Sequence, residues 1–341
     1  MVSNEMRNSS PRVTNAAASS RRWRELALPL GLFALVVVGL AGLAMATGWE
    51  ETLDAFRVLH SREIAILLAL SLVNYVARGI RWHFFARKLG LRTTFQRNLL
   101  HFLGGFAMSV TPGRVGELVR TRWLKRETGW SFERTAPLVL VDRAADLAAM
   151  AILLALSLAF STSGLTGGVP VVLLAIAAAI VVTRPSLMRL AGDLGHLLTR
   201  RAFPRLFVRI RRAAISLTAF TGAPLLLIAG GLGMLGWIAE AYAFQLLLIW
   251  LGTDIGFWKA VGIFLFATLA GGLTGAPGGL GGAEAAMVAL LLLDGVPMEI
   301  AVPATLVIRF TTLWFALAIG VLVFPAVERS SKKASHALED S

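Results

Sequence analysis

Long apolar stretches with few charges constrain this chain more than any other feature. A helix needs roughly 20 mostly apolar residues to cross the hydrocarbon core of a bilayer. Six stretches reach or approach that length: 27–47, 64–85, 135–161, 168–183, 223–251 and 302–326. Hydrophobic residues make up 56% of the chain and charged residues 16%, which is too apolar for one water-soluble core. The sequence therefore predicts an all-α polytopic membrane protein with about six spanning helices.

Two further apolar stretches, 98–113 and 260–293, each contain a Pro-Gly pair, Pro112-Gly113 and Pro277-Gly278, and the hairpins they belong to are expected at 98–125 and 260–293. Proline removes a helical hydrogen bond and glycine permits a chain reversal. Each stretch is therefore predicted to form two short helical limbs folded into a re-entrant hairpin. The residues expected to shape the hairpin tips are Pro112, Gly113, Gly116, Pro277, Gly278, Gly279 and Gly281.

Basic residues predict the orientation in the membrane, because Lys and Arg concentrate on the cytoplasmic side. Segments 1–26, 86–97, 114–134, 184–212 and 327–341 together hold 26 basic and 9 acidic residues. The segments expected on the opposite side, 48–63, 162–167, 252–259 and 294–301, hold three basic and seven acidic residues. This asymmetry accounts for the net charge of +13 and argues against nucleic-acid binding. We expect a multi-pass protein of the cell membrane with cytoplasmic termini, a disordered basic tail at 1–26 and a second tail at 327–341.

The Pro-Gly pairs belong to a longer repeat. Pro112-Gly113 recurs after 165 residues as Pro277-Gly278, and a glutamate follows each pair, Glu117 or Glu284. Farther along, Pro137 and Arg143 are six residues apart, as are Pro303 and Arg309. The halves are therefore expected at 27–161 and 162–326. Because each half crosses the membrane three times, the second is predicted to be inverted, a plan common in secondary transporters.

Ionisable residues at membrane depth are costly, so those that remain are paired or functional. The matching Glu117 with Arg143, and Glu284 with Arg309, are either structural clasps or parts of a polar cavity that holds a lipid phosphate. Arg78 and Arg81 are interpreted as reaching the cytoplasmic boundary. The hypothetical substrate-binding set is Arg114, Glu117, Arg120, Asp142, Arg143, Asp146, Glu284 and Arg309.

Composition argues against several kinds of chemistry. The chain has no cysteine, and none of its five histidines form an HxxxH pair, so we expect no metal site. It contains no GxxxxGK[ST] phosphate loop. We therefore expect no cofactor, no nucleotide hydrolysis and no catalytic residue.

Four segments resemble the transmembrane region of the lysylphosphatidylglycerol synthase family, also called the flippase-like domain. They are Ser109-Val110-Thr111-Pro112-Gly113-Arg114-Val115-Gly116-Glu117-Leu118, Val141-Asp142-Arg143-Ala144-Ala145-Asp146, Thr274-Gly275-Ala276-Pro277-Gly278-Gly279-Leu280-Gly281-Gly282-Ala283-Glu284 and Ile308-Arg309. The resemblance spans roughly residues 60–325 and implies a membrane protein that moves lipids between leaflets. Full-length synthases of that family also carry a soluble catalytic domain, which we do not expect in a chain that ends 15 residues after its last predicted helix.

Three functions remain open. The leading one is a lipid transporter for an anionic or phosphate-containing lipid. The second is a membrane-embedded transferase that uses a polyprenyl phosphate, with Asp142 or Asp146 as acid–base groups. The third is a non-transporting accessory subunit that has a protein partner in lipid or envelope synthesis.

The topology can be tested by single-cysteine labelling, since no native cysteine interferes. Labels at residues 128 and 256 should be accessible from opposite sides of the membrane. Labelling of both positions from one side would contradict the inverted repeat.

Overall fold

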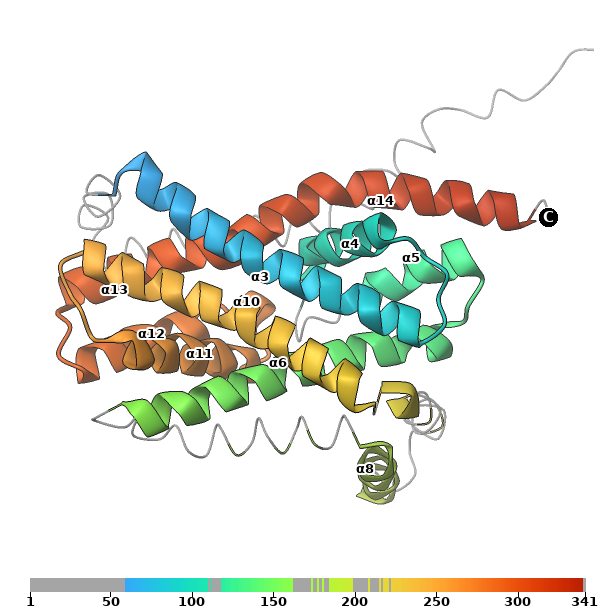
Figure 1. The fold of residues 1–341 in the computed structure, drawn as a ribbon, viewed down its shortest axis with the longest axis horizontal. Coiled ribbons are helices and arrows are strands. Elements are labelled where there is room, and N and C mark those ends of the chain that lie inside the picture. The colour runs from blue at the N-terminus through green and yellow to red at the C-terminus, as the bar shows by residue number, and fades with distance from the viewer. Residues whose placement is uncertain are drawn as a thin grey trace, which may run out of the picture.

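The computed structural model describes residues 59–109, 111, 118–161, 184–198, 217–220 and 222–339, with positions 173, 177, 180, 208 and 215. All regular structure in these residues is helical (Figure 1). The predicted tail 1–26 and span 27–47 lie outside them, as does most of the span 168–183.

The order of long and short helices is the same in the two halves. The first half contains α3 (Ser61–Lys88), α4 (Phe95–Gly104), the 3-10 turn η1 (Gly105–Met108), α5 (Val119–Thr128) and α6 (Phe132–Phe160). A connecting region holds α8 (Pro185–Leu198) and η3 (Leu217–Phe220). The second half contains α10 (Ala223–Trp250), α11 (Phe257–Leu273), η4 (Pro277–Gly279), α12 (Gly282–Leu293), α13 (Met298–Arg309), the π-helical turn η5 (Phe310–Trp314) and α14 (Phe315–Glu339).

Three helical segments of the described residues are long and apolar enough to cross a membrane: Ser61–Lys88, Ala223–Trp250 and Met298–Ser335. They correspond to the predicted spans 64–85, 223–251 and 302–326. The predicted span 135–161 falls on α6, a helix of 29 residues. The total number of spans and the inverted orientation of the halves stay predictions.

The second predicted hairpin region consists of two limbs, α11 and α12, which pack side by side (Figure 1). The break between them contains Gly275, Gly278, Gly279 and Gly281, all with φ between 64° and 78°. Such left-handed values favour glycine, which has no Cβ to clash. In the first half, α4 with η1 and α5 flank the other predicted tip, but residues 112–117 lie outside the described residues. How either hairpin sits in a bilayer stays a prediction.

The repeated prolines occupy the same position in two helices. Pro137 is the sixth residue of α6, and Pro303 is the sixth residue of α13. A proline that early disrupts only the first turns, so both helices continue beyond it. Arg143 and Arg309, six residues after these prolines, therefore occupy the same position relative to the start of their helices.

Buried apolar side chains form two large clusters that meet in the middle of the long helices. One contains Leu67 of α3 and Ala149 of α6, together with much of α10 to α13. The other contains Tyr75 and Trp82 of α3, with side chains from α4, α5 and the first part of α6. Buried polar side chains lie between these clusters, which places ionisable groups deep in an apolar molecule.

The C-terminal helix extends beyond the predicted span and continues through the region expected to be a tail. Glu328 of α14 accepts hydrogen bonds from Arg122 at 2.7 Å, Trp123 at 2.8 Å and Arg126 at 2.7 Å, all on α5. These contacts hold α14 against α5, so the helix continues to Glu339.

Close packing of α11 on α12 predicts opposite effects for two neighbouring glycines. A Cβ at Gly271 would lie 2.6 Å from the Cβ of Ala283, whereas a Cβ at Gly272 would meet nothing within 4 Å. We expect Gly271→Ala to reduce stability by about 1–3 kcal/mol through overpacking. Gly272→Ala should be neutral or slightly stabilising because alanine favours helix. Thermal unfolding of both variants in detergent tests this, and equal midpoints would contradict so close an approach.

Candidate functional site

Two arginines of α3 and two aspartates of α6 form a buried ion-pair network. Arg81 Nη2 lies 2.6 Å from Asp142 Oδ1 and 2.7 Å from Asp146 Oδ1. Arg78 Nη2 lies 2.6 Å from Asp146 Oδ2. The arginines are three residues apart and the aspartates four, so each pair lies on one face of its helix. The interpretation that Arg78 and Arg81 reach the membrane boundary is wrong, because their side chains are only 6% and 0% exposed.

Two further arginines approach the same aspartates. Arg120 Nη1 lies 3.9 Å from Asp142 Oδ2, and Arg143 Nη1 lies 3.6 Å from Asp146 Oδ2. The guanidinium of Arg120 also lies 4.4 Å from the ring centre of Phe102, a favourable cation–π distance. It fits there because Gly105 has no side chain: a Cβ at that position would lie 2.1 Å from Arg120 Nε.

In the second half, Arg309 holds the break between α11 and α12. Its Nε lies 2.5 Å from Glu284 Oε1, and its Nη2 donates to the backbone carbonyl of Gly278 at 2.9 Å. The left-handed conformation of Gly278 is part of the turn that presents this carbonyl. Arg309 and Glu284 therefore form the clasp that was one of the two sequence interpretations. Glu117, its counterpart in the first half, lies outside the described residues.

A π-helical turn follows Arg309 directly. Widened turns of this kind release backbone groups and frequently occur at functional sites. Here the hydroxyl of Tyr75, on α3, donates a hydrogen bond to the backbone carbonyl of Thr312. The turn therefore connects α3 to the segment that carries Arg309.

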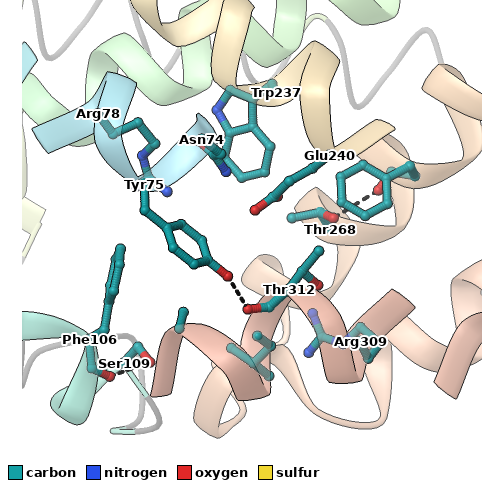
Figure 2. A pocket seen from close by; sticks show the side chains of 13 residues that line it. Asn74, Tyr75, Arg78, Phe106, Ser109, Trp237, Glu240, Thr268, Arg309 and Thr312 are labelled. Carbon is teal, nitrogen blue, oxygen red and sulfur yellow. Dashed lines mark hydrogen bonds between the residues drawn. The ribbon is translucent and has the colours of Figure 1, made fainter. Parts of the chain in front are cut away.

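A polar cavity of about 60 Å³ lies between the two halves, and Figure 2 shows the side chains that line it. Arg78 of α3 and Arg309 of α13 both line it, as does Glu240 of α10. The cavity thus connects the ion-pair network of the first half to the clasp of the second. Its other polar lining residues are Asn74, Tyr75, Ser109, Thr268 and Thr312.

The predicted site residues separate into three groups. Arg120, Asp142, Arg143 and Asp146 gather in the network, while Glu284 and Arg309 form the clasp. Of these six, Arg309 alone is among the lining residues of this cavity. Arg114 and Glu117 lie outside the described residues, as do the tip residues Pro112, Gly113 and Gly116.

Sequence reasoning missed most of the cavity lining. Neither Arg78 nor Glu240 is in the hypothetical substrate-binding set, although both are charged residues within apolar stretches of the sequence. A usable signal was present on α3, where Ser71, Asn74, Arg78 and Arg81 recur at helical spacing within an apolar stretch. Within the described ranges, no three His, Asp or Glu side chains gather in a way that could hold a metal ion.

These features define a helical membrane protein with a charged cavity buried among its long helices. The chain matches the family model of the lysylphosphatidylglycerol synthase transmembrane region over residues 28–320, and it belongs to that family. Two proteins of Methanothermobacter thermautotrophicus, each described as a UPF0104 membrane protein, are similar to it. One is 26% identical over 317 residues, covering 86% of this chain and 94% of the relative. The other is 25% identical over 306 residues, covering 85% and 91%.

The network predicts a large loss of stability when Arg81 is replaced. Arg81→Met keeps a long side chain but leaves Asp142 buried without its closest cation, and breaking a buried pair in this way costs about 3–5 kcal/mol. Arg62→Met, at the exposed start of the same helix, should change stability by no more than about 0.5 kcal/mol. Unfolding in mixed detergent measures both. Equal stability of the two variants would show that the network does not stabilise the fold.

Proposed function

We propose that this protein moves an anionic or phosphate-containing lipid between the leaflets of the cell membrane. The observation that carries the proposal is the cavity that arginines from both halves, Arg78 and Arg309, line. Guanidinium groups bind phosphate through charge-assisted and often bidentate hydrogen bonds. Ionisable residues at this depth are costly to insert, which favours a role in the passage of a polar group.

Neither arginine uses all of its N–H groups in the contacts described above. The Nε of Arg78 is buried and has no hydrogen-bond partner among the described residues, so a ligand would reach it only after the cavity opened. The two hydrogen bonds of Arg309 use its Nε and Nη2. Glu240 in the same cavity would accept a hydrogen bond from a hydroxyl or amine. The cavity therefore suits a headgroup that combines a phosphate with such a donor.

The cavity has a volume of about 60 Å³, several times the roughly 10–15 Å³ that one water molecule requires. In this proposal the structure represents a closed state, and lipid enters when the long helices separate on one side. Inverted halves with cytoplasmic termini would supply two such states, and the re-entrant hairpins would move with Arg309 and its counterpart. Energy would come from a lipid or ion gradient.

The transferase alternative requires a carboxylate that reaches the substrate. Asp142 and Asp146 are held by Arg81 and Arg78, and neither lines the cavity. This arrangement favours a positioning role for them, and we propose no catalytic step.

Lipid exchange by the purified protein in vesicles, with several labelled headgroups, tests the function. Movement of a phosphate-containing lipid without chemical change supports the proposal. A new lipid product would favour the transferase, and no movement of any lipid would favour the accessory subunit.

Conservative substitutions test the role of the cavity. Arg78→Lys and Arg309→Lys retain a positive charge beside Asp146 and Glu284, so folded yield should remain near normal. They lose the planar fork of guanidinium, and transport should slow by about tenfold or more. Arg62→Lys, exposed on α3, is the matched control and should transport at the native rate. Native transport by well-folded Arg309→Lys would remove this residue from the lipid site.

A further inference from the structure

Helix α8 carries an apolar face that is exposed. Leu187, Leu190, Leu194 and Leu197 follow one another at spacings of three and four residues, so they lie along one side of the helix. Their exposed fractions are 36%, 54%, 50% and 64%. Arg189 and His196 lie on the other side of the helix, at about 120° or more from the centre of the leucine face.

The stretch of sequence that contains this helix is strongly basic. Residues 184–212 contain eight arginines and one acidic residue, Asp193. Arg184 and Arg189 are both exposed. Arginine on an amphipathic helix provides electrostatic attraction to anionic lipid headgroups in addition to apolar burial.

The position of α8 places it beside the membrane-embedded part of the molecule. Figure 1 shows that it runs across the direction of the long helices, near the end where α10 begins. Arg184, just before α8, lines a mostly apolar groove of about 370 Å³ together with Ala144 and Ala148 of α6 and Leu226 of α10. A helix oriented across the spanning helices lies parallel to the membrane plane.

We propose that α8 lies in the headgroup region of the bilayer, at the basic end of the molecule. Its leucine face points toward the acyl chains, and Arg189 of the helix and Arg184 just before it contact anionic headgroups. Amphipathic helices at the interface bury their apolar face about 5–10 Å into the boundary between headgroups and acyl chains. The proposal concerns a surface away from the central cavity and does not depend on lipid transport.

A lipid surface explains these observations better than a protein partner. Arg184, just before α8, lines a mostly apolar groove on the side of the bundle. The excess of arginine in residues 184–212 complements an anionic leaflet. A second copy of the chain would bring two strongly basic segments together, which is electrostatically unfavourable.

Depth measurements on the full chain in vesicles test this placement. Because the native chain has no cysteine, nitroxide labels can be attached to single cysteines at Leu190 and Leu194, with the exposed Arg189 as the matched position on the polar face. In vesicles of phosphatidylcholine mixed with phosphatidylglycerol, the labels at the leucine positions should be accessible to dissolved oxygen and protected from a water-soluble nickel chelate. The label at Arg189 should show the reverse.

Two outcomes would overturn the placement. Access of the nickel chelate to all three positions would place α8 in water. Protection of the leucine positions from both reagents would show that protein covers them. A comparison with vesicles of pure phosphatidylcholine tests the role of charge: the oxygen-to-nickel accessibility ratio at Leu194 should fall by about twofold or more. An unchanged ratio would refute recognition of anionic lipid.

Discussion

The buried contact between the arginines of α3 and the aspartates of α6 determines how the long helices can pack. Each of these groups would be prohibitively costly at this depth without a partner. Their pairing therefore fixes α3 against α6. These polar side chains also require small residues on α10: Gly233 leaves room for Arg81, and Gly236 leaves room for Asn74. A side chain at either glycine would clash with these polar groups, so the polar groups on α3 determine which two positions of α10 must be glycine.

The same polar layer explains why a cavity exists where it does. Apolar side chains fill space by interdigitating, as they do in the two clusters on either side. Charged side chains must instead direct their polar atoms toward specific partners, and Arg78 turns toward Asp146 while Arg309 turns toward Glu284. The space between them is lined by smaller polar groups together with apolar side chains such as Trp237 and Phe264, which places a partly polar cavity inside an apolar molecule.

Much of the architecture was predictable because apolar runs and Pro-Gly pairs act locally. They located α3, α10, the segment from α13 to α14 and the break between α11 and α12. The sequence left two alternatives for Arg309 and Glu284, a structural clasp or a polar cavity. In the structure Arg309 pairs with Glu284 and also lines the cavity. The partners of Arg78 and Arg81 were missed because a single sequence defines the face of a helix but not the helix opposite. The π-helical turn has no local sequence signature, and the helix through Glu328 depends on contacts with α5.

The π-helical turn at Phe310–Trp314 has a mechanical consequence. A π turn holds one residue more than a regular α-helical turn, so it stores a register offset between α13 and α14. If the offset relaxed, the two segments would rotate relative to each other by about 100°, the angle of one helical residue. The hydroxyl of Tyr75 donates a hydrogen bond to the carbonyl of Thr312 inside this turn, and this bond would oppose the rotation. Arg309 therefore lies next to the one point in the helix from Met298 to Glu339 where such a rotation would occur.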